Sequence, residues 1–342
     1  MVLLDATGKM IMKCRPLSIW WLCAAVCMGL PAEGRTPRSF PHEDTQYVSL
    51  THLAHFYGLG RVVEEGDSFL LNGDRIHIEF VRDSRIMKVN HTIVWLHEPV
   101  RRVRRRWALS EADVRVVIDP LLRTNRHLAR AGWNRIVLDP GHGGGDRGAV
   151  SPGGLTEKEL TLDIAQRVRS LLLSEGIEVF MTRDTDRAIP ISERIQLTKD
   201  WNADAFISIH FNFASNPNAR GTESFVLPGA GLGSTASNNP RGEYPETPGN
   251  MHDGANAILG YHIQRHLLKQ TGNADRGVRR ARFAVLRDAP CPAVLVECAF
   301  LSYAPEEALL STESYRDALA RGIAGGILDY IATVQRVTMG VR

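Results

Sequence analysis

The chain has 342 residues, of which 44% are hydrophobic and 23% charged. These fractions are ordinary for a soluble protein with a core, and the length allows two domains at roughly 100–200 residues each. The formal net charge of +3 is too small to indicate a nucleic-acid-binding protein, so no nucleic acid is expected among its partners.

The first 34 residues are predicted to be a secretory signal peptide. Lys13 and Arg15 precede an apolar run over residues 17–30, and a Pro-Ala-Glu-Gly stretch follows this run. A basic start, a short apolar core and a small-residue exit are the parts of such a signal. The run is also shorter than the about 20 residues of a transmembrane helix, although an uncleaved anchor or a buried helix is the alternative. We therefore expect secretion across the inner membrane to the periplasm or cell envelope, without stable membrane insertion after cleavage.

Two of the five cysteines, Cys291 and Cys298, lie outside the predicted signal peptide. Two cysteines do not make a disulfide scaffold. Cys298 lies in a strand-like run, which is typical of a small buried hydrophobic residue. Unpaired cysteines are therefore favoured over a disulfide.

Residues 35–44 are predicted to be a linker, and residues 45–126 a small β-rich α+β domain. Residues 51–58 have a helical pattern that ends at a glycine, and a second helix is expected near residues 110–114. The predicted strands show alternating patterns and lie at residues 68–71, 75–80, 86–89 and 92–96. This pattern resembles the N-terminal domain of copper amine oxidases, which implies an accessory domain, and no copper ligands are evident.

Residues 101–106, Arg-Arg-Val-Arg-Arg-Arg, form the strongest local charge run. A solvated strand or loop is the favoured interpretation. An electrostatic contact with an anionic polymer of the envelope is the alternative.

Residues 130–342 are predicted to form a second domain of the α/β class, an open, mostly parallel sheet with helices on both faces. Buried-type strands alternate here with amphipathic helices, which is the pattern of a sheet covered on both sides. The predicted strands are 135–139, 177–182, 205–210, 222–227 and 293–297. The predicted helices are 159–175, 191–200, 252–271 and 312–334.

Four residues that carry chemistry lie near the ends of these predicted elements. His142 follows the first strand, and His210 and Glu297 each end a later strand. Glu157 lies just before the first helix. Ligands of open α/β sheets bind at the carboxyl ends of the strands, so we expect these side chains to converge there.

This set of residues matches the requirements of zinc-assisted hydrolysis. A catalytic zinc takes three protein ligands from His and carboxylate and leaves one position for water, whose pKa the metal lowers. A nearby carboxylate then takes a proton from the water and passes it to the leaving nitrogen. We assign the ligand role to His142, Glu157 and His210 and the proton-transfer role to Glu297.

Other catalytic and nucleotide-binding motifs are missing from the sequence. The Gly-rich stretch 141–145 lacks the Lys-Ser/Thr ending of a P-loop and the spacing of a dinucleotide fingerprint. Neither a His-Glu-x-x-His zincin motif nor a Gly-x-Ser-x-Gly elbow is present.

The segment over residues 134–335 resembles the zinc-dependent N-acetylmuramoyl-L-alanine amidases of the amidase-3 family of cell-wall hydrolases. The matching pieces, in the order and separations of the family, are residues 136–144, 156–160, 208–212, 276–278, 285–287, 292–297 and 300–302. The resemblance implies that His142, Glu157 and His210 bind zinc and that Glu297 is the catalytic glutamate. It also implies cleavage of the amide between N-acetylmuramic acid and L-alanine of peptidoglycan, in cell-wall remodelling or daughter-cell separation.

Three neighbouring residues have two interpretations each. Asn212 binds substrate or orients His210 through a hydrogen bond, or it is a turn residue. Arg287 contacts the acidic stem peptide of the substrate, or it is a surface arginine. Asp139 fixes the loop of His142, or it caps the turn.

Two alternative functions stay open from the sequence. One is a zinc peptidase that acts on the peptidoglycan stem. The other is a catalytically silent wall-binding protein, although the presence of all four site residues counts against it. The protein is expected to be a monomer with peptidoglycan as partner, and an activator protein is a further candidate partner.

Residues 229–253 are rich in Gly, Ser, Asn and Pro and are predicted to be a long polar loop that lines the substrate groove. Some members of the family carry an inhibitory helix in this region, whose glutamate occupies the zinc. No helical pattern is evident here, although Glu243 and Glu246 are candidate plugs.

Overall fold

The computed structural model describes residues 36–129, 132–236 and 244–340. The predicted signal peptide lies outside these ranges and stays a prediction. Within them, no helix has both the length and the apolar character needed to cross a membrane. Cys291 and Cys298 are both buried and free in the described residues.

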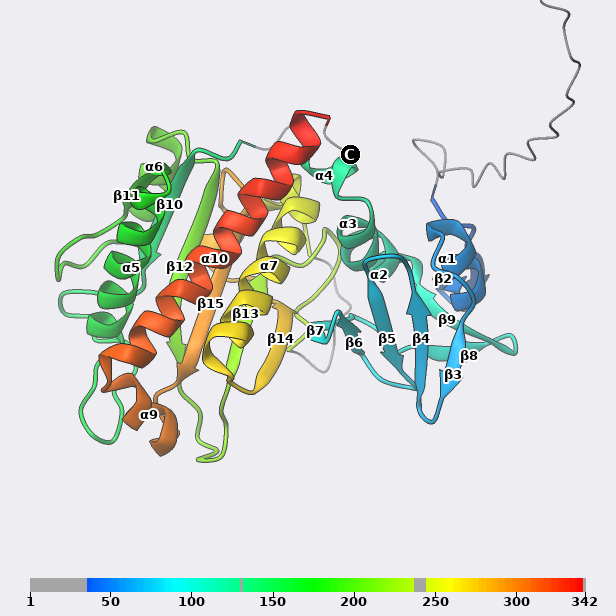
Figure 1. Cartoon of the computed structure of the whole chain (residues 1–342), viewed down its shortest axis with the longest axis horizontal. Helices are drawn as coiled ribbons and strands as arrows, with labels where there is room; N and C mark the ends of the chain where they lie inside the picture. The colour runs from blue at the N-terminus through cyan, green and yellow to red at the C-terminus, as the bar shows by residue number, and fades with distance from the viewer. Residues whose placement is uncertain (1–35, 130–131, 237–243, 341–342) are drawn as a thin grey trace, which may run out of the picture. The chain divides into compact units, whose positions relative to one another are not determined.

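The N-terminal part is built from antiparallel strands in two groups (Figure 1). The first group is a four-stranded sheet of β2 (Thr45–Ser49), β9 (Arg106–Ser110), β1 (Phe40–His42) and β8 (Arg101–Val103). The second group runs through β3 (Val63–Glu65), β4 (Ser68–Asn72), β5 (His77–Val81), β6 (Ile86–Val89) and β7 (Thr92–Trp95). The predicted small β-rich α+β domain is confirmed, and β1 lies inside the predicted linker.

Alternating burial explains why these segments form strands. Phe69 and Leu71 of β4 are buried, as are Ile78 and Phe80 of β5, whereas the residues between them are partly exposed. A period of two places one face of the sheet on the core.

In the hairpin of β8 and β9, four arginines of the charge run are exposed, namely Arg102, Arg104, Arg105 and Arg106.

Helical segments complete this part of the chain. Helix α1 (Leu50–Tyr57) begins where the Ser49 side chain accepts a hydrogen bond from the backbone N–H of His52. It ends at Gly58, whose φ of 67° is readily adopted by glycine. The segments that lead to the second part are α2 (Glu111–Asp113), the π-helix η1 (Val114–Ile118), α3 (Asp119–Leu122) and α4 (Thr124–Leu128).

The central sheet of the second part has the order β11-β10-β12-β15-β13-β14. Its strands are β10 (Arg135–Pro140), β11 (Glu178–Met181), β12 (Ala205–Asn212), β13 (Thr222–Val226), β14 (Asp275–Arg280) and β15 (Ala293–Phe300). Neighbouring strands are parallel except β13 and β15, which are antiparallel. The predicted open, mostly parallel sheet is therefore confirmed.

Helices cover both faces of this sheet. One face carries α5 (Glu157–Ser174), α7 (Asp253–Thr271) and α10 (Glu313–Thr338), which Figure 1 shows in front of the strands. The other helices are α6 (Ile191–Asp200), α8 (Ala284–Arg287) and α9 (Ala304–Leu310). Ile207 of β12 packs in the core below the three long helices. Its neighbour Phe206 points to the opposite face, where it joins a cluster with Leu286 of α8 and Trp201 at the end of α6.

Three element boundaries at the predicted site residues differ from the prediction. Strand β15 continues to Phe300, so Glu297 lies inside a strand and not at its end, because the apolar residues after it are buried in the same sheet. Strand β12 likewise runs two residues past His210, with an irregularity in its pairing there. Helix α5 begins at Glu157 itself. Strand β14 and helix α9 were not predicted.

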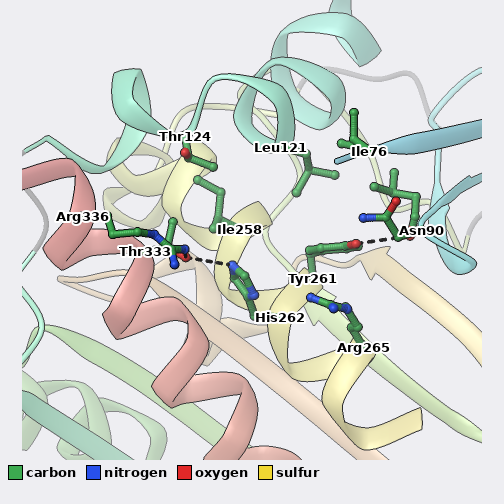
Figure 2. A pocket seen from close by; sticks show the side chains of 11 residues that line it. Ile76, Asn90, Leu121, Thr124, Ile258, Tyr261, His262, Arg265, Thr333 and Arg336 are labelled. Carbon is green, nitrogen blue, oxygen red and sulfur yellow. Dashed lines mark hydrogen bonds between the residues drawn. The ribbon is translucent and has the colours of Figure 1, made fainter. Parts of the chain in front are cut away.

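The two parts of the described chain share one sheet. Strand β7 pairs in parallel with β14, with Val94 opposite Val278, and the sheet then continues from β7 to β3. Tyr261 of α7 donates a hydrogen bond to the carbonyl oxygen of Val89. A cavity of about 210 Å³ lies at this junction, and His262 of α7 is among the lining side chains that Figure 2 shows. The predicted domain boundaries, 45–126 and 130–342, stay predictions.

Candidate metal centre

His142 lies in the loop after β10 and has a φ of 62°, a conformation that few side-chain-bearing residues adopt. Its Nδ1 lies 2.9 Å from Oδ2 of Asp146. Its Nε2 lies 3.1 Å from Oε1 of Glu157. If the ring donates its Nδ1 proton to Asp146, the Nε2 lone pair is free to bind a metal ion.

Glu157 is the point at which the three predicted ligands meet. As the first residue of α5 it is 4% exposed, and its Oε1 lies 2.9 Å from Nδ1 of His210. Its Oε2 accepts a hydrogen bond of 2.8 Å from the backbone N–H of Ala149. One ligand atom from each of His142, Glu157 and His210 lies within 4.8 Å of the others. Two imidazoles and one carboxylate at this spacing are arranged to bind a metal ion.

The two histidines and Glu157 stabilise each other's charged forms. Burial alone would raise the pKa of Glu157, but hydrogen bonds from His142 and His210 outweigh it and lower the pKa well below its ordinary value. The pKa of His142 is raised, mainly by its hydrogen bond with Glu157. Glu157 is therefore an anion at neutral pH, which is the form that binds a cation.

Two buried arginines fix the loop that carries His142. Arg194 donates hydrogen bonds to the carbonyl oxygens of Pro140, at 2.8 Å, and His142, at 2.9 Å. Arg183, which is fully buried, donates to the carbonyl oxygens of Pro140 and Gly141. Asp139 accepts from Arg194. Of the two interpretations of Asp139, fixing the loop is the one that these contacts favour.

Glu297 lies on β15 beside the ligand cluster. In the sheet it is opposite His210 on one side and opposite Glu223 on the other. Its Oε2 is buried and, among the described residues, accepts no hydrogen bond. Burial raises the pKa of Glu297 well above its ordinary value, and the negative charges of Glu157 and Glu223 add to this effect. A carboxylate with a free oxygen and a raised pKa is suited to exchange protons.

The two predicted substrate-binding residues lie in different surroundings. Asn212, at the end of β12, donates a hydrogen bond of 2.7 Å to Oε1 of Glu223, next to Glu297. Arg287 ends the short helix α8, and its ion-pair partner is the neighbouring Asp288, at 3.9 Å. The contacts of Asn212 therefore place it by the site, whereas those of Arg287 do not.

The polar loop of residues 229–253 contains one short helical segment in its described portion, the 3₁₀ helix η2 (Pro248–His252). Glu246 is exposed and does not belong to the ligand cluster. Glu243 lies outside the described residues. The described part of the loop thus places no glutamate among the three metal ligands.

Sequence reasoning missed four residues that this geometry brings to the site: Asp146, Arg183, Arg194 and Glu223. Asp146 has a recognisable signal, because it is an acidic residue four positions after His142 in a glycine-rich loop. The other three are buried or nearly so. Each lies in a segment whose sequence alone resembles any other strand end or helix turn.

Two histidines from a mostly parallel sheet and its loops meet a carboxylate at the start of α5, with a further carboxylate on β15 beside them. This combination is that of a metal-dependent hydrolase. The family model described as N-acetylmuramoyl-L-alanine amidase, Amidase_3, matches residues 136–329. The chain belongs to this family of peptidoglycan hydrolases. The predicted resemblance and the predicted enzyme class are therefore confirmed, whereas no comparison identifies the N-terminal domain.

The chain is also similar to individual proteins. The chain is 40% identical over 220 residues to the amidase AmiC of Neisseria meningitidis, an alignment that covers 58% of this chain and 53% of that protein. It is 32% identical over 250 residues to AmiA of Escherichia coli, covering 65% of this chain and 86% of that protein. The catalytic domain of CwlV from Bacillus (Paenibacillus) polymyxa is similar at 30% identity and a TM-score of 0.49, covering 58% of this chain and 99% of that one. The chain thus spans about half the length of the Neisseria relative and most of the Escherichia one.

Proposed function

We propose that this protein is a zinc-dependent amidase that hydrolyses the bond between N-acetylmuramic acid and L-alanine in peptidoglycan. The observation that carries the proposal is the convergence of His142, Glu157 and His210 within 4.8 Å, with Glu297 on the neighbouring strand. Two imidazole nitrogens and one carboxylate oxygen fit zinc, which takes three such ligands at catalytic sites. The family match supports peptidoglycan as the substrate.

The residues of the site divide the work of hydrolysis. When bound, zinc would lower the pKa of a water molecule and polarise the scissile carbonyl. His142, Glu157 and His210 would hold the metal, and Asp146 orients the His142 ring. Glu297 takes the proton from the attacking water and passes it to the leaving nitrogen of L-alanine. Its free Oε2 is the atom that accepts this proton.

Substrate contacts are assigned to two side chains. Asn212 is held by Glu223 through its amide nitrogen, which leaves its amide oxygen to accept a hydrogen bond from the substrate or to orient His210. Arg287 is about two-fifths exposed, with 42% of its side-chain surface accessible, and is assigned to the carboxylates of the stem peptide. The described part of the 229–253 loop is assigned to the wall of the groove.

The cellular setting follows from the predicted signal peptide and the substrate. We infer that residues 1–34 direct the protein across the inner membrane and are removed. The remaining protein then acts as a monomer in the periplasm or envelope, in cell-wall remodelling or daughter-cell separation. An activator protein is a further candidate partner, and residues 45–126 are assigned to an accessory domain.

Metal analysis combined with mass spectrometry of digested peptidoglycan tests this function. Purified protein should contain one zinc ion per chain and should release stem peptides with free L-alanine amino termini, leaving the glycan strands intact. Cleavage inside the stem would instead identify a zinc peptidase. Binding to cell walls without any cleavage would identify a silent wall-binding protein.

A further inference from the structure

A row of charged side chains extends from Glu297 across the sheet towards the N-terminal part of the chain. Glu223 of β13 lies opposite Glu297 in the antiparallel pair and is 4% exposed. Its Oε1 accepts the hydrogen bond from Asn212. A buried carboxylate beside a second one is unfavourable unless cations balance the charge. The positively charged side chains around Glu223 therefore determine whether Glu223 and Glu297 can lie side by side.

Two arginines of β14 supply the balancing charge. Nε of Arg279 lies 2.9 Å from Oε2 of Glu223, and Nε of Arg276 lies 3.3 Å from the same oxygen. Both arginine side chains are largely buried, with 18% and 31% of their surface exposed. Solvent therefore screens these ion pairs less than it screens exposed ones. Displacement of a guanidinium would therefore weaken the electrostatic stabilisation of the Glu223 carboxylate.

Trp95 contacts both arginines from the neighbouring strand, Arg279 through its guanidinium and Arg276 through its backbone. The guanidinium carbon of Arg279 lies 4.5 Å from the centre of the Trp95 ring, within the range of a cation–π interaction. The indole Nε1 donates a hydrogen bond of 2.8 Å to the carbonyl oxygen of Arg276. Trp95 is the last residue of β7, which lies next to β14 in the sheet (Figure 1).

Trp95 thus connects the N-terminal strands to the two arginines beside Glu223. We propose that Trp95 is a positioning residue for the amidase reaction and acts through Arg279 on Glu223. This proposal rests on the proposed function. Removal of the ring would let the Arg279 guanidinium move away from Glu223. Glu223 would then repel Glu297 and hold Asn212 less firmly, while the zinc ligands keep their own contacts.

The N-terminal strands are, in this proposal, part of the catalytic machinery and not only an accessory module. The effect of a Trp95 substitution can be told apart from other defects. A loss of positioning lowers kcat, a loss of metal lowers the zinc content, and a loss of folding stability lowers Tm. Trp107 offers a matched control. It is a tryptophan of the same N-terminal part and contacts an arginine, Arg82, at 5.1 Å from its ring centre, but it lies outside the catalytic row.

The test compares Trp95→Leu, Trp95→Phe and Trp107→Leu in the full chain. The measurements are kcat and KM on solubilised peptidoglycan, zinc content and Tm. Trp95→Leu should lose at least about tenfold in kcat, the scale of a misplaced reacting group, with KM and zinc content unchanged. Trp95→Phe keeps an aromatic face for Arg279 and should recover most of the loss. Trp107→Leu should lower Tm with little effect on kcat.

A double-mutant cycle separates positioning from general destabilisation. If Trp95 acts through Arg279, Trp95→Leu should cause no further loss of kcat in an Arg279→Met background. Additive losses, or a Trp95→Leu variant whose kcat equals that of the wild type, would overturn the proposal. If Trp95→Leu does not fold, Arg279→Met decides, because it removes the charge through which Trp95 would act on Glu223. An unchanged kcat in that variant would overturn the proposal equally.

The same data distinguish a failure of this inference from a failure of the proposed function. A wild-type protein that releases no L-alanine amino termini from peptidoglycan would overturn both. A fully active wild type with unaffected Trp95 and Arg279 variants would overturn the positioning role alone.

Discussion

Asp146 accepts a hydrogen bond from Nδ1 of His142 at 2.9 Å, on the side of the ring away from Glu157. This contact fixes the tautomer in which Nε2 is free to bind zinc, so the Asp146→Asn variant should bind zinc about 10–100-fold more weakly. Competition with a chelator of known affinity measures the change. Asp184→Asn, the same substitution at an exposed aspartate, is the control and should bind zinc as the wild type does. Equal zinc affinity in both variants would contradict the orienting role.

The glycines around His142 differ in how much space they have. A Cβ at Gly148 would lie 2.6 Å from both Oε2 of Glu157 and Cδ2 of His142, and the φ there is +62°. Gly148→Ala should therefore displace two zinc ligands and abolish zinc binding and activity. Gly145→Ala is the matched control in the same loop, because a Cβ there has no atom within 4 Å. A zinc content near one per chain in Gly148→Ala would refute this view of the loop.

Glu297 is assigned to proton transfer and not to the metal. Glu297→Gln removes the proton-accepting oxygen and retains the shape, so kcat should fall by between about 10²- and 10⁴-fold with zinc content unchanged. Kinetics on solubilised peptidoglycan and metal analysis of the same sample give both quantities. Glu193→Gln, at an exposed position of α6, should match the wild type. Loss of zinc from Glu297→Gln would show that Glu297 is a ligand instead.

The sequence alone leads to the metal ligands because their position follows from a general rule. His142 and His210 come after buried strands, and the carboxyl ends of parallel strands meet at one edge. Glu297 was predicted to end a strand for the same reason, although β15 runs three residues further. The apolar residues after Glu297 continue the buried pattern, and a charged residue inside a strand resembles the end of one.

The residues that the sequence does not reveal are those whose partners are distant in the chain. Trp95 and Arg276 are 181 positions apart, and their contact depends on the pairing of β7 with β14. Strand β14 itself consists largely of charged residues and glycine, so its pattern does not resemble a buried strand. The role of Glu223 depends on the order of the strands in the sheet, which places it opposite Glu297.

Arg194 donates to two loop carbonyl groups and to the carboxylate of Asp139 from a buried position. Arg194→Lys keeps the charge but cannot reach all three acceptors, which leaves buried groups unpaired. The variant should lose about 2–4 kcal/mol of unfolding free energy, measured by urea denaturation. Arg167→Lys is the comparison, because Arg167 pairs with Asp163 and Asp317 near the surface. Its loss should stay below about 1 kcal/mol, and similar losses in both variants would contradict the prediction.

Asp119 joins three parts of the N-terminal region and should make stability depend on pH. Burial alone would raise its pKa, but hydrogen bonds from His127, Tyr57 and Arg123 outweigh burial and lower the pKa from 3.8 to about 2. A lowered pKa means that the carboxylate stabilises the fold above pH 3.8 and loses this effect as the pH falls towards 2. The full contribution is about 2 kcal/mol.

The Asp119→Asn variant isolates this contribution. At pH 6 it should be about 2 kcal/mol less stable than the wild type, and the difference should shrink as the pH is lowered towards 2. Urea denaturation of zinc-free protein across this range measures the difference without a contribution from metal release. Asp67→Asn, whose side chain is 90% exposed in the wild type, is the control and should follow the wild-type curve. A difference between Asp119→Asn and the wild type that stays constant with pH would mean that shape and hydrogen bonding, and not the charge of Asp119, stabilise this region.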